Sequence, residues 1–389
     1  MRAADNPFTP GSGLLPPALV GRDADLEVLD IMIDRVHNGL PNRGMVLTGL
    51  RGVGKTVLLN EMQRRTEEAG WFVVKAEARA DTAGAATLRR NVARSMVAQA
   101  RALAVRSPRE RIQRALQAVQ SFSVSLGMNG VDLGVTMQHG RADSKDLEID
   151  LPELVEDVCT ALDGTALALF LDEMQDVDAE MMGALLYTQH EAGQRGWPFY
   201  VIGAGLPPLP GILAEIRSYA ERLFDYRQMG KLIDPDDARA LVDPVTTRKA
   251  WFTSESLGIL REAAGGYPYF LQEYGRAVWE TAPGPEITAT DAHLAVALGR
   301  ERLDSGFFAS RWSRATPSER RLLVAMAEDG DGPSATGTVA QRLGLRTTSL
   351  GPARAALISK GLIYAPEHGL MAYTVPGMAD YVRRNREDA

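Results

Sequence analysis

The chain has 389 residues, of which 45% are hydrophobic and 24% are charged, and its formal net charge is −7. At about 150 residues per domain this length fits two or three domains, and the composition excludes collagen, coiled coil and disorder throughout. The single cysteine, Cys159, excludes an internal disulfide framework and a cysteine-rich zinc module. The acidic balance argues against a protein that coats nucleic acid, although it leaves room for a local basic site.

The N-terminal residues and the apolar runs argue against a secretion signal and a membrane span. Residues 1–9 lack the apolar stretch of a secretory signal. The longest apolar run, 166–171, is far shorter than the roughly 20 residues of a membrane-spanning helix. We therefore expect a cytoplasmic protein with no membrane partner.

In chain order, the elements predict an α/β fold. Residues 1–17, with Pro and Gly enriched at 10–17, predict a flexible or extended lead-in. Short apolar strands then alternate with helices, which indicates a mostly parallel sheet with helices on both faces. The predicted strands are 45–48, 71–74, 166–171 and 199–202, and the predicted helices are 23–37, 57–69, 87–119 (interrupted near Pro108) and 153–162. Residues 236–299 are predicted to be helical, with a break at 265–266.

Residues 121–138 alternate strictly between apolar and small or polar side chains, around Asn129-Gly130. Asn-Gly is the strongest two-residue signal for a β-hairpin turn, so this segment predicts a hairpin with one apolar face. A two-stranded hairpin is marginal alone and must bury that face. It could pack on the protein's own core or contact another subunit or a partner.

Residues 49–56, Gly-Leu-Arg-Gly-Val-Gly-Lys-Thr, fit the pattern GxxxxGK[ST] between a predicted strand and a predicted helix. Glycines let successive backbone N–H groups point at a phosphate, and the following helix presents its positive end to the same anion. Lys55 would reach the β- and γ-phosphates, and Thr56 would bind Mg²⁺. The predicted nucleotide ligands here are Gly49, Leu50, Arg51, Gly52, Val53, Gly54, Lys55, Thr56 and Val57.

A second motif is acidic: Asp172 and Glu173 come directly after the predicted strand 166–171. The carboxyl edge of an α/β sheet is where ligands bind. Asp172 would hold Mg²⁺ through water, and Glu173 would orient or deprotonate the attacking water. The alternative is a solvated acidic loop, because Asp176 and Asp178 follow closely. Together the two motifs predict an ATPase with Lys55 and Glu173 as catalytic residues and with ATP and Mg²⁺ as cofactors.

These motifs resemble the Walker A and Walker B elements of P-loop ATPases. Residues 20–26, Val-Gly-Arg-Asp-Ala-Asp-Leu, are similar to the box that precedes the core in AAA+ origin-recognition initiators and STAND ATPases. The resemblance runs from about 18 to 384, and it implies that Val20 and Gly21 border the adenine. It also implies an ATPase core at 18–230, a helical lid at 231–299 and a winged-helix domain at 300–389.

The lid segment resembles STAND ATPases more than initiators. Residues 266–271, Gly-Tyr-Pro-Tyr-Phe-Leu, are similar to the GxP motif of STAND ATPases, which makes Pro268 a candidate nucleotide contact. Tyr269 stands where initiators have the sensor 2 arginine, and Arg276 is the alternative for that role. The strand 199–202 runs into Gly-Ala-Gly-Leu-Pro, without the Asn or Thr expected at sensor 1.

Residues 218–224 resemble the segment that carries the arginine finger, with Arg222 as the first candidate and Arg217 as the second. An arginine supplied in trans would complete the site only in an oligomer, so a nucleotide-dependent homo-oligomer is implied. The alternative for Arg222 is an ordinary surface salt bridge.

The C-terminal segment has helical patterns at 318–327, 335–343 and 347–359, then a strand, a turn and a strand up to 375, an order similar to a winged helix. Residues 300–389 hold 13 Lys and Arg and 10 Asp and Glu, a net +3 that leaves −10 for the rest. This asymmetry favours double-stranded DNA as a partner. The candidate contacts are Arg346, Thr347, Thr348, Ser349 and Arg354, with Lys360 behind them. The alternative is a winged helix used for protein contacts or autoinhibition.

The sequence thus predicts an ATP-hydrolysing AAA+/STAND-like switch whose nucleotide state controls assembly and DNA engagement. The alternative is a signalling or defence ATPase that senses a partner protein. A nucleotide-binding scaffold without turnover is a third hypothesis, against which the intact Asp172 and Glu173 argue.

Overall fold

The computed structural model describes residues 1–80, 83–106, 110–126, 142–162 and 165–386. The chain forms two compact units. The sheet unit consists of 23–48 and 58–228, and the other, called the second unit below, consists of 1–22, 49–57 and 229–389.

The sheet unit is built on five parallel strands in the order β2-β3-β4-β1-β5. The strands are β1 (Gly44–Thr48), β2 (Phe72–Glu77), β3 (Leu167–Asp172), β4 (Phe199–Gly205) and β5 (Phe224–Gln228). Every residue of β1, β3 and β4 is buried, as expected for central strands of a parallel sheet covered on both faces. The predicted α/β fold is therefore confirmed, and β5 is a strand that the sequence did not indicate.

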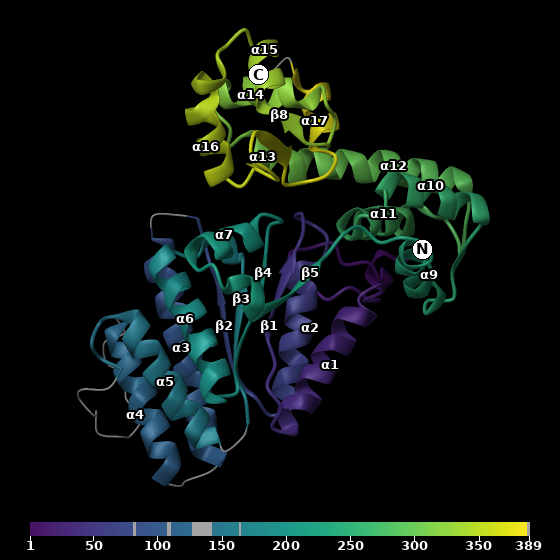
Figure 1. Cartoon of the computed structure of the whole chain (residues 1–389). Coiled ribbons are helices and arrows are strands. Elements are labelled where there is room, and N and C mark those ends of the chain that lie inside the picture. The colour runs from purple at the N-terminus through teal and green to yellow at the C-terminus, as the bar shows by residue number, and fades with distance from the viewer. Residues whose placement is uncertain (81–82, 107–109, 127–141, 163–164, 387–389) are drawn as a thin grey trace. The chain divides into compact units, whose positions relative to one another are not determined.

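Helices cover this sheet, with α1 and α2 on one side and α3, α5 and α6 on the other (Figure 1). The helices are α1 (Asp23–His37), α2 (Lys55–Glu68), α3 (Gly84–Arg106), α4 (Glu110–Ser125), α5 (Leu147–Leu162), α6 (Ala179–Arg195), α7 (Leu209–Ile216) and α8 (Ala220–Leu223). Cys159 is buried on α5, and burial raises the pKa of its thiol to about 12, so it acts as a small apolar packing residue. In the described part of the chain, no helix has both the length and the apolar character needed to cross a membrane.

The hairpin predicted at 121–138 is wrong in its first strand. Helix α4 continues through Ser125, and Phe122 and Leu126 are buried in the core with Val119. The spacing of these three side chains, three and four residues apart, makes one helical stripe, and this stripe overrides the period of two that the serines suggested. Residues 127–141, which include Asn129-Gly130, lie outside the described residues.

The second unit contains two parallel two-residue strands, β6 and β7, and a run of helices that ends in the C-terminal module. Its first elements are α9 (Asp236–Thr246), β6 (Trp251–Phe252), α10 (Ser254–Ala264), α11 (Pro268–Thr281), β7 (Glu286–Ile287) and α12 (Ala289–Arg302). The sequence predicted helices here, with a break at 265–266, and Gly265 and Gly266 do end α10 with positive φ angles of 56° and 77°.

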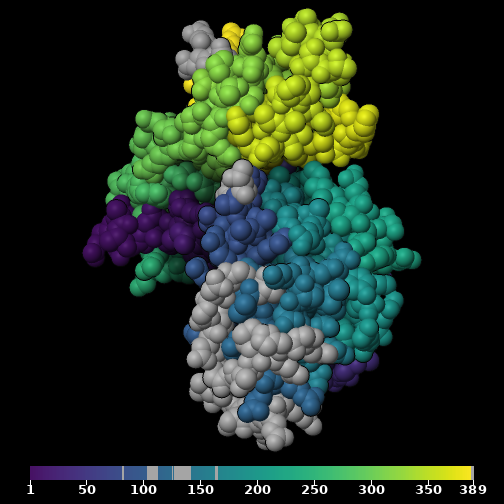
Figure 2. Space-filling view, turned by 90° about the vertical axis from the view of Figure 1, so that its left-hand side faces the viewer, coloured from purple at the N-terminus to yellow at the C-terminus, as the bar shows by residue number. Residues whose placement is uncertain are grey.

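The N-terminal segment 1–17 is extended apart from η1 (Ala3–Asp5), but its first residues are bound to α11. Trp279 Nε1 donates a hydrogen bond to Arg2 O at 2.9 Å. Phe8 is buried against Gly275, where a Cβ would stand 2.5 Å from the Phe8 ring. Figure 2 shows these purple residues seated against the green residues of the same unit. The first nine residues are thus anchored on this unit by the buried Phe8.

The C-terminal module follows α12 without a linker. The helix continues through the π-helix η3 (Leu303–Phe308) into α13 (Ala309–Trp312), so the boundary predicted at 299/300 falls inside α12. The module then contains α14 (Pro317–Ala327), β8 (Ser334–Ala335), α15 (Thr336–Arg342), η4 (Thr347–Leu350), α16 (Gly351–Ser359), β9 (Ile363–Tyr364), β10 (Leu370–Tyr373) and α17 (Met378–Arg384). Its three strands pair antiparallel in the order β8-β10-β9.

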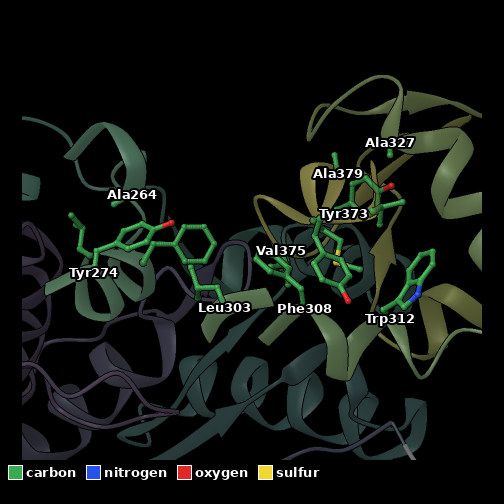
Figure 3. Packing of buried hydrophobic residues seen from close by; sticks show 14 of the residues in the cluster. Ala264, Tyr274, Leu303, Phe308, Trp312, Ala327, Tyr373, Val375 and Ala379 are labelled. Carbon is green, nitrogen blue, oxygen red and sulfur yellow. The ribbon is translucent and has the colours of Figure 1, made fainter. Parts of the chain in front are cut away.

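One hydrophobic core runs through the whole of this second unit. The buried side chains form a row from Tyr274 on α11, through Leu303 and Phe308 on η3, to Trp312 on α13 (Figure 3). Phe308 stacks on Tyr381 of α17, with ring centroids 5.4 Å apart. Helices α9 to α12, called the lid here after the segment named in the sequence analysis, and the C-terminal module are thus joined by packing as well as by the chain.

Candidate functional site

The phosphate loop leaves β1 at Thr48 and enters α2 at Lys55. Gly52 and Gly54 have φ angles of 87° and 93°, a left-handed region that favours glycine, so the loop curls as the motif requires. Lys55 is buried, and its Nζ donates to Gly49 O and Leu50 O at 2.9 Å each. The lysine therefore closes the loop into a compact ring next to the helix N-terminus, where Thr56 and Val57 lie in the first turn.

The box residues before the core lie beside this loop. Val20 is buried, and a Cβ on Gly21 (φ +68°) would stand 2.9 Å from both Asp236 and Leu232 side chains. Arg22, to which the sequence assigned no role, is buried and joins these parts. Its Nη2 donates to Val53 O in the loop and to Gly230 O, at 3.0 Å each.

Replacing Arg22 with methionine should lower the free energy of unfolding by about 2 kcal/mol, because a buried carbonyl left without a donor costs about 1–3 kcal/mol. The affinity for ATP should also fall, since Val53 would lose its anchor. Denaturant unfolding and calorimetric titration with ATP measure the two effects. The exposed Arg43 gives the matched control, and R43M should stay within about 0.5 kcal/mol of wild type. Wild-type stability and affinity in R22M would refute the bridging role.

Two parts of the second unit form hydrogen bonds with the backbone of the phosphate loop. Helix α11 begins at Pro268, and the next N–H, that of Tyr269, donates to Gly52 O at 3.3 Å. The Arg51 N–H donates to the O of Thr374, directly after β10, at 2.9 Å. Thr374 is itself fixed in the module, because its hydroxyl donates to Gly361 O at 2.8 Å. The lid and the C-terminal module thus each bond directly to the backbone of this loop.

The acidic pair lies at the carboxyl edge of the sheet, where β3 ends. Asp172 is buried, and its Oδ1 accepts the N–H of Glu173 at 2.9 Å. Glu173 has a left-handed backbone (φ 52°, ψ 45°), which turns its side chain away from the strand direction. Its Oε2 accepts a hydrogen bond from Nε2 of Gln175 at 2.6 Å. Each of the two carboxylates thus accepts a hydrogen bond from a specific donor, which argues against a merely solvated acidic loop.

The sequence missed Gln175, which lies on η2 (Met174–Asp176). Its Oε1 accepts the Leu206 N–H at 3.0 Å, so one amide joins Glu173 to the end of β4. The signal was present in the strand itself, since glycines inside a buried strand indicate a close approach by a neighbour. Gly203 and Gly205 make room for Met174 and Gln175 respectively.

The arginine candidates differ in their surroundings. Arg222 is exposed on the short helix α8. Arg217 is ion-paired with Glu148, which gives it a structural partner within the sheet unit. Arg276, the alternative for sensor 2, is ion-paired with Glu280 at 3.0 Å on the same helix. Of these three arginines, only Arg222 has no carboxylate partner among the described residues.

The predicted DNA contacts lie on η4 and α16. Arg346, which precedes η4, is exposed together with the three polar residues 347–349. Arg354 is half-buried on α16. Lys360 donates to Glu319 Oε2 at 2.6 Å, so an acidic partner already neutralises the lysine expected behind the contacts.

Comparison with known proteins bears directly on this site. Residues 18–202 match the family model for the AAA ATPase domain. This segment is similar to AAA ATPase domains over slightly less than half of the chain. Residues 305–382 match a domain of unknown function, DUF8462. No curated protein sequence matches the chain.

Solved structures share the fold. The Walker-type ATPase paby2304 of Pyrococcus abyssi is 13% identical, with a TM-score of 0.58 and with 94% of this chain and 96% of that chain covered. Less similar are the Holliday junction branch migration motor RuvB of Thermotoga maritima (13% identity, TM-score 0.45, 93% and 96% covered) and the Orc1 protein of Aeropyrum pernix in complex with DNA (15%, 0.43, 95% and 94%). The domain match supports an ATPase, and the first of these structures shares the fold.

The residues present fit a magnesium nucleotide. Within the described ranges, no group of three or more His, Cys, Asp or Glu side chains could hold a metal by itself. Magnesium bound with ATP needs no such group, because phosphates and waters supply most of its ligands. The sequence motifs assign this ion to Thr56 and Asp172.

Proposed function

We propose that this ATPase is a nucleotide-controlled switch, in which ATP acts on the C-terminal module through the phosphate loop and so controls assembly and partner engagement. The hydrogen bond from Arg51 N–H to Thr374 O carries this proposal. A phosphate that changes the conformation of the loop would move the Arg51 N–H, which donates to Thr374 of the module. The Tyr269 bond to Gly52 gives the lid the same direct connection.

In this proposal, ATP binding exchanges the partners of Lys55. Its Nζ would leave Gly49 O and Leu50 O for oxygens of the β- and γ-phosphates. Glu173 would orient the attacking water and take its proton while the water oxygen bonds to the γ-phosphorus and the bond to ADP breaks. Mg²⁺, when bound, neutralises charge on the phosphates. An exposed Arg222 supports completion of the site by a second copy of the chain.

We propose a winged helix for the C-terminal module. Its order, α14, β8, α15, α16, β9, β10, with the three strands in one antiparallel sheet, supports this assignment. The exposed Arg346 and residues 347–349 support contacts to double-stranded DNA.

A protein partner is the second candidate, and one observation favours it. The outward positions of α16, the helix that would enter a major groove, carry no charge: they are Gly351, Pro352, Ala355, Ile358 and Ser359. DNA affinity depends on basic side chains that reach phosphates, whereas small and apolar side chains suit a protein surface.

Light scattering and fluorescence anisotropy on a labelled DNA duplex test the switch together, each with and without a non-hydrolysable ATP analogue. An increase in mass with the analogue supports assembly, and an unchanged monomer mass contradicts it.

A DNA affinity that falls as the salt concentration rises supports the DNA contact. In R346A the slope of the log binding constant against the log salt concentration should be smaller in magnitude by about 1. R248A, which removes an exposed lid arginine, is the control with the same charge change. Absence of binding at low salt would favour the protein partner.

A further inference from the structure

Gln175 ties the carboxylate of Glu173 to the segment that follows β4. Its Nε2 donates to Glu173 Oε2 at 2.6 Å, and its Oε1 accepts the N–H of Leu206 at 3.0 Å. Both ends of the amide are therefore engaged, which fixes the orientation of the side chain. A hydrogen bond to an ionised carboxylate is roughly twice as strong as one between neutral groups.

The backbone around Glu173 is held as firmly as its side chain. The left-handed conformation costs a non-glycine residue about 1–2 kcal/mol, so surrounding contacts must impose it. One such contact is the 2.9 Å hydrogen bond from Glu173 N–H to Asp172 Oδ1. A second is the Asp176 N–H, which donates to Glu173 O at 2.9 Å and closes the turn. These two bonds fix the backbone of Glu173, and the bond from Gln175 acts on its carboxylate directly.

The end of β4 is shaped to receive Gln175. A Cβ on Gly203 would collide with Met174 Sδ, and a Cβ on Gly205 would stand 2.7 Å from Gln175 Oε1. Any larger residue at these positions would push η2 off the strand. The last three residues of β4, Gly-Ala-Gly, bring no polar side chain, so the amide of Gln175 is the polar group that they accommodate.

We propose that Gln175 is a positioning residue for ATP hydrolysis, which orients the Glu173 carboxylate and connects it to the loop after β4. This inference rests on the proposed role of Glu173 as the group that activates water. Because Gln175 holds Oε2, it sets the direction in which Oε1 points. Movement of Leu206 and the loop that follows would reach Glu173 through this one amide, so the state of β4 is coupled to the rate of hydrolysis.

Q175A tests the inference, with kcat and KM for ATP as the measured quantities. We expect kcat to fall by about 10²-fold, the cost of misplacing a reacting group by roughly 1 Å, while KM stays near wild type. Q175N keeps the amide on a side chain that is one methylene shorter, so its kcat should lie between that of Q175A and that of wild type. A merely structural role would lower stability and leave the kcat of the folded enzyme unchanged.

Gln189 provides the matched control. It is a buried amide on α6 that also bridges to β4, since its Nε2 donates to Phe199 O at 3.1 Å and its Oε1 accepts the Val201 N–H at 2.8 Å. Q189A therefore removes the same kind of bridge from the same strand at its other end. Its kcat should stay near wild type, although its stability should fall. An equal loss of kcat in Q189A and Q175A would assign the effect to β4 and overturn the inference.

The double variant separates this inference from the proposed function. If Gln175 acts through Glu173, E173Q/Q175A should hydrolyse ATP no more slowly than E173Q alone. A further loss in the double variant, or a wild-type kcat in Q175A beside an inactive E173Q, overturns the role of Gln175 and leaves the role of Glu173 intact. A wild-type rate in E173Q itself would instead refute the role of Glu173.

Discussion

E173Q should lower the rate of ATP hydrolysis by about 10²- to 10⁴-fold, the usual contribution of a positioned general base, and should leave ATP binding unchanged. An amide cannot take a proton from water. Glutamine has the size of glutamate, and its side-chain oxygen can still accept the N–H of Gln175, so the turn after β3 should be preserved. The phosphate loop is not altered, so affinity for ATP should not change.

Phosphate release gives the rate, and calorimetric titration with ATP gives the affinity. E180Q is the matched control, because Glu180 is a more exposed carboxylate at the start of α6 that is paired with Arg89 at 2.8 Å. It should hydrolyse ATP at the wild-type rate. K55A adds the opposite control, since it should lose binding and turnover together. Hydrolysis by E173Q at the wild-type rate would remove Glu173 from the mechanism.

The residues of the phosphate loop could be predicted because their chemistry is local. Eight consecutive residues carry the pattern, and the loop takes its shape from glycines whose positive φ is a property of the residue itself. The acidic pair could be predicted for a similar reason, since a short apolar run followed directly by two carboxylates can be recognised in the sequence alone. Both motifs report what the backbone does within a few residues.

The residues that hold these motifs could not be predicted, because their partners are distant in sequence. Arg22 bonds to Val53 and to Gly230, and Gln175 bonds to Leu206. A guanidinium or an amide at these positions looks like an ordinary surface residue until the fold brings its acceptor near. The glycines of β4 gave the one local hint, and its meaning depends on η2, which packs against it.

Two predictions of secondary structure failed for different reasons, the first because a short pattern can fit two periods. Phe122 and Leu126 lie four residues apart, so they satisfy both a strand with alternating faces and a helix with one stripe. Burial on the core decided for the helix. Strand β5 was missed because Phe224–Gln228 carries two charged residues, and pairing with β1 rather than apolar character makes it a strand.

The division of the chain differs from the one predicted, for a reason visible at the ends of the phosphate loop. The family resemblance implied a core at 18–230, but 18–22 and 49–57 group with the C-terminal residues. The bonds from Arg22 and Arg51 account for this grouping. The loop that would bind ATP thus belongs, by its contacts, to the unit that carries the lid and the module.

F308A should lower the free energy of unfolding of this second unit by about 3–5 kcal/mol, the range for removing a buried phenylalanine side chain. Phe308 is buried, and its ring lies 5.4 Å from Tyr381 and 6.2 Å from Phe270 between ring centroids. Such aromatic pairs add about 0.5–1.5 kcal/mol each beyond the area they bury. The cavity would open between α11 and α17, which belong to the lid and to the module.

Denaturant unfolding followed by circular dichroism measures the loss, and limited proteolysis reports which segments open. L294A is the control, because Leu294 on α12 is 50% exposed, and it should change stability by no more than about 0.5 kcal/mol. If lid and module share one core, F308A should make both susceptible to protease at the same denaturant concentration. Opening of residues beyond 312 while α9 to α11 stay protected would show that the module folds separately. In that case ATP could act on the module only through the loop contact from Arg51 to Thr374, and not through the packing of the lid.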